Sequence, residues 1–151
     1  MGETFTNTYL QWLKEEFEKS PFWQHMDITF ERLEVGDVMI QMPAKTELMN
    51  SNGVMHGGAI TSILDSVIGV TIRSTKEVRV ATISLTTQFV APVTGGTLYA
   101  SAKIINHNKK IQYVESKVSN EKGETIGIAL GTFKVLPLNR MNTFNPVQKG
   151  T

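Results

Sequence analysis

The sequence predicts an α+β domain in which an antiparallel β-sheet wraps around one long helix, with a second helix near the N-terminus. Apolar residues recur at helical spacing from about residue 57 to 74, which indicates a long helix with a broad apolar face. Three or four extended segments follow it, separated by short turns, as is typical of antiparallel strands. A helix with so many large apolar residues is unsuited to the surface, so we expect the sheet to bury it.

The N-terminal part predicts one amphipathic helix and a strand hairpin. We expect the helix at residues 8–19, because apolar residues recur there at helical spacing and Pro21 lies just past the end as a stop signal. Its apolar residues are Tyr9, Leu10, Leu13 and Phe17. Two short extended runs follow, at 27–33 and 38–42, divided by turn residues at 34–37.

The remaining elements follow from a loop, the long helix and the later extended runs. Residues 45–55 carry turn residues without periodicity and predict a loop. The helix at 57–74 has an apolar stripe made of Ile60, Ile63, Leu64, Val67, Ile68 and Ile72. Strands are expected at about 79–89, 97–106, 110–119 and 125–136, and the polar residues 137–151 predict an irregular tail.

Length and composition predict a single domain spanning residues 1–151, with its core in about 27–136. A formal net charge of +1 argues against a nucleic-acid partner, since such proteins usually carry a strong basic excess. The absence of cysteine rules out disulfides and cysteine-based nucleophiles or metal sites. The first twenty residues contain acidic side chains and no long apolar run, so we expect neither a signal peptide nor a membrane partner, and a cytoplasmic location.

The stretch from Asn50 to Asp65, NSNGVMHGGAITSILD, combines a glycine-rich loop with the start of the apolar helix. The first turn of a helix presents free backbone N–H groups at its positive end, and Gly57 and Gly58 permit close approach to them. Such a site can bind an anion or an oxygen on which negative charge develops during a reaction. Alternatively, the glycines only make the turn and let the helix pack.

Asp65 lies about two turns, or roughly 10 Å, from that helix start. At 100° per residue it shares a strip with Gly58, Thr61 and Gly69, and this strip of small residues borders the apolar stripe. The carboxylate therefore stands at the edge of the buried face. It is either a functional group or a boundary aspartate in contact with solvent or a lysine.

No motif predicts a metal or a cofactor. His25, His56 and His107 are far apart in the sequence and lack metal-ligand spacing. His56 either orients the loop beside a reaction centre or simply makes a hydrogen bond. The motifs typical of serine hydrolases, P-loop proteins and dinucleotide-binding proteins are absent from the sequence.

The spaced pattern resembles the hotdog-fold acyl-CoA thioesterases of the phenylacetyl-CoA and thioesterase-superfamily-member-2 type. It consists of Asn50, Gly53, His56, Gly57 and Gly58, followed by Asp65. The resemblance extends over about residues 27–136 and includes Thr82, Leu85, Phe89 and Pro92, then Gly95-Gly96, and the corner at Lys109-Lys110.

The resemblance implies a hotdog fold and a homodimer, commonly a dimer of dimers, with acyl-CoA as substrate and the active site at the dimer interface. It implies that the Gly57 N–H polarises the thioester carbonyl, with Asn50 and His56 beside it. Asp65 of the other subunit would be general base or nucleophile, two roles that the sequence does not separate. Thr82 would help to hold the water. Gly58 would belong to the substrate-binding helix start.

Lys109 and Lys110 are candidates for binding the phosphates of CoA, although a pair of lysines is also typical of a solvated turn. Two other activities are compatible with the same fold. A non-catalytic acyl-CoA binder or sensor is the main alternative, although hotdog regulators resemble fusions to a DNA-binding helix-turn-helix. A hotdog dehydratase would resemble a different pattern of histidine and acidic residues, which this sequence lacks.

Overall fold

A computed structural model describes residues 2–106 and 108–138 of the chain, with side chains from residue 7 onward. Three α-helices, one short 3-10 turn and six strands follow one another within these residues. In chain order they are α1 (Gly2–Glu18), α2 (Pro21–Met26), β1 (Thr29–Glu34), β2 (Asp37–Pro43), η1 (Thr46–Leu48), α3 (Gly57–Thr75), β3 (Val78–Phe89), β4 (Thr97–Ile104), β5 (Ile111–Ser119) and β6 (Thr125–Pro137).

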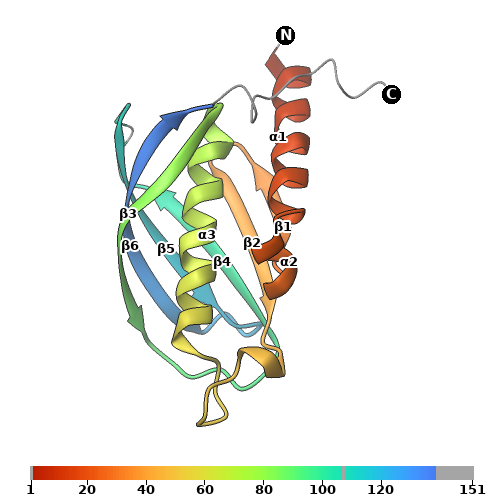
Figure 1. Cartoon of the computed structure of the whole chain (residues 1–151), viewed down its shortest axis with the longest axis vertical. Helices are drawn as coiled ribbons and strands as arrows, with labels where there is room; N and C mark the ends of the chain where they lie inside the picture. The colour runs from red at the N-terminus through yellow and green to blue at the C-terminus, as the bar shows by residue number, and fades with distance from the viewer. Residues whose placement is uncertain (1, 107, 139–151) are drawn as a thin grey trace.

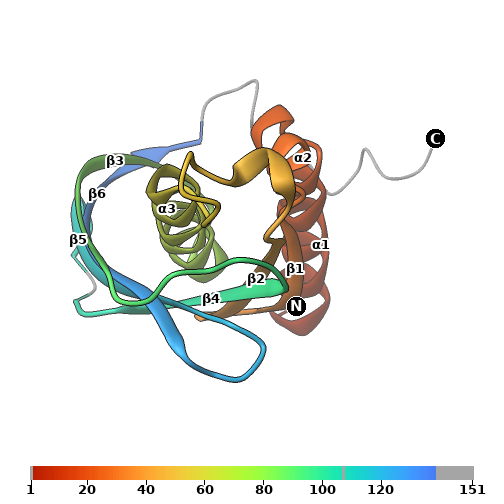
Figure 2. The same ribbon diagram turned by 90° about the horizontal axis from the view of Figure 1, so that it is seen from below.

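The six strands form one antiparallel sheet in the order β1-β2-β4-β5-β6-β3. The sheet curves around α3, which contacts every strand from β2 to β6 (Figures 1 and 2). Helices α1 and α2 stand beside β1, at the other end of the sheet from β3 (Figure 2). This is the hotdog architecture, so the predicted fold class, including the extra N-terminal helix, is confirmed.

The long helix α3 is buried because its apolar stripe faces the inside of the curved sheet. All six residues of the predicted stripe are buried, five of them completely: Ile63, Leu64, Val67, Ile68 and Ile72. Burying each large aliphatic side chain contributes roughly 1.5–3 kcal/mol from the hydrophobic effect. The inner residues of β2, β4, β5 and β6 complete the same core.

Strand β3 contains a β-bulge that changes which side chains face α3. Its register against β6 shifts between Thr82 and Ser84, so Ile83 is the extra residue and is 56% exposed. Successive strand residues point to opposite faces, so Thr82 and Phe89, seven positions apart, would face opposite ways in a regular strand. The bulge shifts this alternation by one residue, and both side chains are directed toward α3.

The N-terminal helix differs from the sequence-based prediction at both ends. It begins at Gly2, six residues before the predicted start at Thr8, and ends at Glu18, one residue early. The prediction missed the first turns because they carry mostly polar residues and show no apolar period. The interpretation of Pro21 as a stop signal was incomplete. Proline is also favoured in the first turn of a helix, where its missing N–H is not needed, and here it begins α2.

Two aromatic residues and a hydroxyl join α1 to the C-terminal end of α3. The Tyr9 hydroxyl donates to the carbonyl oxygen of Arg73 at 2.8 Å, with the Lys76 carbonyl oxygen at 3.1 Å. These carbonyls lie at the helix end, where no intrahelical donor is available. The Arg73 guanidinium carbon lies 5.8 Å from the ring centre of Trp12 and 5.3 Å from that of Phe17, within the range of cation–π attraction.

The predicted hairpin and the later strands are confirmed to within two residues at every end. The segment at 97–106 ends earlier as a strand, at Ile104. The predicted loop at 45–55 holds the short turn η1, and β6 runs to Pro137. Residue 107 of the turn after β4, and the predicted tail from residue 139, lie outside the described residues.

Replacing Tyr9 with phenylalanine should lower the free energy of unfolding by about 0.5–1.5 kcal/mol, because the ring remains while the hydroxyl donor is lost. Burial raises the pKa of Tyr9 to about 12, against the opposing charge of Arg73. Between pH 10 and about 12 the unfolded chain therefore releases this proton while the folded chain retains it, and folding stability falls as pH rises. Urea denaturation across this range should show the gap between the wild-type protein and Tyr9→Phe narrowing.

Candidate active site

The loop before α3 is folded around the Asn50 side chain. The Oδ1 atom of Asn50 accepts the N–H groups of Asn52 at 2.9 Å and Val54 at 3.3 Å. Gly53 adopts a φ of 74°, which glycine takes at little cost. The Asn50 amide thus fixes the shape of the loop from within, and it belongs to the same segment as the start of α3.

His56 is the N-cap residue of α3. Its backbone is extended, with φ −62° and ψ 136°, and its ring Nδ1 accepts the Gly58 N–H at 2.8 Å. A Cβ atom at Gly58 would lie 3.0 Å from this Nδ1, so glycine at this position leaves room for the histidine ring. In this arrangement Nδ1 is the unprotonated nitrogen of the ring. The histidine satisfies one of the free N–H groups of the first turn.

The N–H group of Gly57, the first residue of α3, has no hydrogen-bond partner among the residues that the structure describes. It borders a hollow of about 350 Å³ between the helix start and the end of β3. The hollow is lined by Val54, Met55, Gly57, Ile60, Phe89, Val90, Ala91 and Pro92. The Phe89 ring lies so close to the helix start that a Cβ on Gly57 would be 3.1 Å from its Cζ atom. A free donor at the positive end of a helix therefore faces an apolar hollow.

Asp65 lies beside a second hollow, of about 320 Å³, farther along the same helix. The Thr82 hydroxyl of β3 donates to Asp65 Oδ1 at 2.7 Å. Asp65 is half-buried, and Gly69, one turn farther on, is buried against Val80 of β3. The second hollow is lined by Phe17, Asp65, Ser66, Gly69, Arg73, Arg79, Val80, Thr82 and Phe133.

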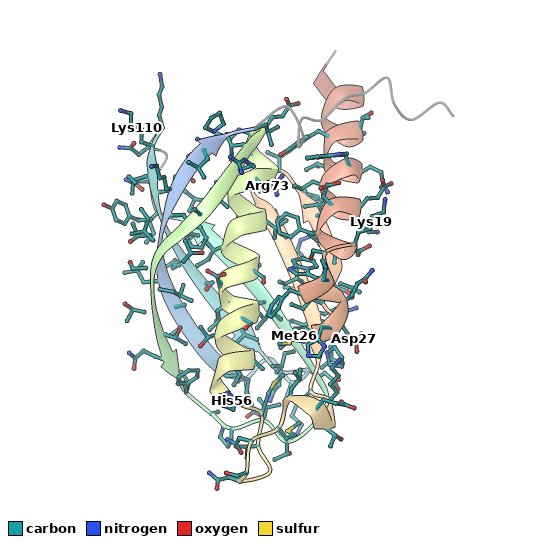
Figure 3. The ribbon with its side chains drawn as sticks, viewed as in Figure 1. Lys19, Met26, Asp27, His56, Arg73 and Lys110 are labelled. Atoms are coloured by element: carbon teal, nitrogen blue, oxygen red, sulfur yellow. The ribbon has the colours of Figure 1, made fainter. Side chains whose placement is uncertain are left out.

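Within one chain, the structure brings together some of the predicted site residues and separates others. Asn50, His56, Gly57 and Gly58 share the helix start. Asp65 is eight residues from Gly57, so it lies about 12 Å farther along the helix axis. Lys109 and Lys110 precede β5, and Figure 3 shows Lys110 and His56 at opposite ends of the molecule.

Sequence reasoning did not identify four residues that line the two hollows. Phe89 was noticed in the strand pattern, but its contact with Gly57 depends on the bulge in β3. The helical period assigns Phe17 only to the apolar face of α1. Arg73 and Arg79 belong to no recognised motif. Their positive charge beside an apolar segment was the sequence feature that could have marked them as site residues.

No group of three or more metal-binding side chains occurs among residues 7–106 and 108–138. Over the described part of the chain, no helix has the length and apolar character needed to cross a membrane.

Comparison with known proteins gives a consistent result. Residues 52–126, which include α3 and the following three strands, match the Thioesterase superfamily. The chain is 26% identical over 124 residues to a Thermoplasma acidophilum protein named "Putative esterase", covering 82% of this chain and 94% of that protein.

Solved structures show the same fold. The Escherichia coli PaaI protein from the phenylacetic acid degradation operon superposes with a TM-score of 0.80 at 18% identity, over 87% of this chain and 95% of that one. A glutamine-to-alanine mutant of a Pseudomonas aeruginosa thioesterase gives 0.77 at 20% identity, over 85% and 94%.

Replacing His56 with alanine should lower the free energy of unfolding by about 0.5–2 kcal/mol, because the Gly58 N–H loses its acceptor. Serine at this position restores an N-cap acceptor and should recover most of the loss. Urea denaturation of the two variants is the measurement, and equal stability of His56→Ala and the wild-type protein would contradict the capping role.

Proposed function

The chain belongs to the hotdog-fold thioesterase superfamily, and we propose that it hydrolyses an acyl-CoA thioester to the free acid and CoA at a site shared by two protomers. Membership of this family supports a thioester hydrolase in general terms. The choice of CoA as the thiol carrier and the roles of individual residues are part of the proposal.

One observation carries the proposal: the two groups that thioester hydrolysis needs, an oxyanion donor and a carboxylate, border separate hollows along one boundary. This boundary between α3 (Gly57–Thr75) and β3 (Val78–Phe89) is called the α3–β3 seam. The Gly57 N–H is a free donor suited to an oxygen that gains negative charge. Asp65, held by Thr82, is a carboxylate suited to delivering water or attacking the carbonyl. About 12 Å of helix separates them in one protomer, so one chain does not complete the site.

Strand β3 supports a dimer that would complete it. It is an edge strand of twelve residues, and most of its side chains are exposed, including the large apolar Ile83 and Phe89. A long exposed edge strand is a template for pairing with another chain. Two copies paired antiparallel along β3 would be related by a two-fold axis, which reverses the ends of the seam. Gly57 of one protomer would then lie at the end where its partner carries Asp65.

The proposed reaction uses water as its only co-reactant and no cofactor. Asp65 accepts a proton as the water oxygen bonds to the carbonyl carbon, and the carbonyl oxygen becomes an oxyanion held by the Gly57 N–H. The C–S bond then breaks, and the CoA thiolate leaves and takes up the proton. In the nucleophilic alternative, the Asp65 oxygen bonds to the carbonyl carbon, the C–S bond breaks and the CoA thiolate leaves, and water then hydrolyses the resulting anhydride to the free acid and the Asp65 carboxylate. The Thr82 hydroxyl orients the carboxylate in both, while Asn50 and His56 shape the helix start and Gly58 helps to form it.

In this proposal, Lys109 and Lys110 bind the phosphates of CoA at the active site of the partner protomer. Lys110 lies at the end of the molecule opposite the helix start of its own chain (Figure 3), and Lys109 is its neighbour in the sequence. The same two-fold reversal would carry them toward the Gly57 end of the other protomer, where they would meet the phosphates of CoA as point charges.

A further assembly into a dimer of dimers is supported by the outer face of the sheet. Four large apolar side chains are 42–55% exposed there: Ile105, Tyr113, Ile128 and Leu130. All but Tyr113 border a hollow of about 680 Å³ that is also lined by Lys103, Glu115 and Lys117. Two such faces, related by a two-fold axis, would bury the apolar residues and pair charges of opposite sign.

Replacing Asp65 with asparagine should lower kcat by about 10²–10⁴-fold while leaving the fold intact, because the amide retains an oxygen for Thr82 and cannot accept the proton. Asp37→Asn is the matched control, since it removes the same charge from an exposed ion pair with Arg32. Release of free thiol from a panel of CoA thioesters is the measurement. An Asp65→Asn protein with wild-type turnover would refute the proposal, and thioester binding without thiol release by the wild type would favour a non-catalytic binder.

Replacing Gly57 with proline should lower kcat by about 10²–10³-fold, because proline removes the N–H donor. The position tolerates proline, since it is the first helical residue and the preceding His56 is already extended. Gly57→Ala is the control: it places the same Cβ near Phe89 and retains the N–H. Equal losses in both variants would mean that bulk, and not the donor, matters.

Mixing the two inactive variants tests whether the site is shared. A mixed dimer of Asp65→Asn and Gly57→Pro protomers has one site with both groups intact and one site with both groups altered. Refolding the variants together should therefore restore activity that neither has alone. If each site lay within a single chain, no mixture would recover activity.

A further inference from the structure

The hollow beside Asp65 has two arginines at its far end. Arg73 lies on α3, eight residues or about 12 Å along the axis from Asp65, and Arg79 lies on β3 across the seam. Figure 3 shows Arg73 at the end of α3 away from His56. A carboxylate and two guanidinium groups therefore line one hollow of about 320 Å³.

Arg73 is held in place by its neighbours. Its Nε donates to the Val78 carbonyl oxygen at 2.9 Å, and its guanidinium lies over the rings of Trp12 and Phe17. Phe17 lines the same hollow. Such contacts leave little freedom for the side chain, so binding a ligand would cost little side-chain entropy.

Within the described part of the chain, neither arginine forms an ion pair. The ion pairs formed among residues 7–106 and 108–138 are Arg32 with Asp37 and Lys45 with Asp27. Burial lowers the pKa of Arg73 and the nearby charge of Arg79 lowers it further, while Tyr9 and Glu16 partly offset this. Arg73 nevertheless remains protonated at neutral pH. Two adjacent positive charges with partly buried surroundings favour an anion between them.

We propose that Arg73 and Arg79 bind an anionic group of the thioester substrate, a carboxylate or a phosphate, at the end of the hollow away from Asp65. The inference rests on the proposed function, because it takes Asp65 as the point where the thioester carbonyl lies. Guanidinium groups match both carboxylates and phosphates with paired N–H donors.

The anion has two possible sources. A carboxylate at the distal end of the acyl chain would make the enzyme selective for thioesters of dicarboxylic acids. A phosphate of CoA would instead make these arginines part of the carrier site. The Nε–H of Arg73 donates to the Val78 carbonyl oxygen and that of Arg79 to the Pro137 carbonyl oxygen, so both guanidinium groups are anchored at this end of the hollow, and Tyr9 also contacts that of Arg73.

The test compares Arg79→Gln with the wild-type protein on four thioesters. These are a dicarboxylic monothioester and a neutral acyl thioester of equal chain length, each carried on CoA and on pantetheine, which lacks the phosphates. Arg32→Gln is the control, since it removes an arginine charge far from the seam. Arg73→Lys is the second variant. It retains a positive charge beside the aromatic rings and loses the planar guanidinium, and its folding is checked by thermal denaturation.

The proposal predicts that Arg79→Gln lowers kcat/KM by about 10-fold or more for every thioester that carries the anionic group bound by the arginines. If the anion is the acyl carboxylate, the loss follows the dicarboxylic substrate on both carriers, and if it is phosphate, the loss follows CoA with both acyl groups. Changes no larger than those of Arg32→Gln on all four thioesters would overturn it. A wild-type protein that hydrolyses none of the four would contradict the proposed function itself, whereas hydrolysis independent of Arg79 and Arg73 would contradict only the anion site.

Discussion

The burial of α3 is the interaction on which the rest of the structure depends. The large apolar side chains of α3 are buried, so other elements must pack against most sides of the helix. A single sheet can contact so many sides only if it curves around the helix. The curvature leaves one strip of α3 beside the edge strand β3. Small residues on that strip, such as Gly69, allow close contact with β3 and leave room for the hollows. The same packing that stabilises the domain thus creates the seam that carries the candidate site.

The bulge in β3 connects the two halves of that seam. A strand with regular alternation would direct either Thr82 or Phe89 at the helix, and the extra residue Ile83 allows both. Thr82 orients the Asp65 carboxylate, and Phe89 covers the start of α3 at Gly57. A local backbone irregularity therefore sets the geometry of two groups that lie about 12 Å apart along the helix. Bulges at such positions commonly re-aim side chains beside functional sites.

The N-terminal helix is joined to the same region through the far end of α3. Tyr9 satisfies the carbonyls at the helix end, and Phe17 both contacts Arg73 and lines the hollow of Asp65. Stability and substrate selection would therefore share residues. Because core contacts of this kind are closely packed, substitutions in α1 that change side-chain volume should alter the shape of the hollow as well as the stability of the fold.

The sequence by itself determined the features that local physics controls. The apolar period of α3, the strand and turn pattern, and the glycines after His56 each involve residues close together in the chain. They predicted the fold class and the position of the helix start at Gly57. The short helix α2 was missed because proline ends one helix and begins another with the same residue.

Only the tertiary structure decided which distant residues meet. The Asp65–Thr82 hydrogen bond, which spans seventeen residues, was not predicted. The resemblance implied only that both residues belong to the active site, with Thr82 beside the water. The contact of Phe89 with Gly57 and the position of Arg73 between α1 and β3 were not predicted at all. These contacts depend on the phase of a bulged strand and on the docking of a helix. Neither is encoded in a local period, because each is the result of packing surfaces that lie far apart in the chain.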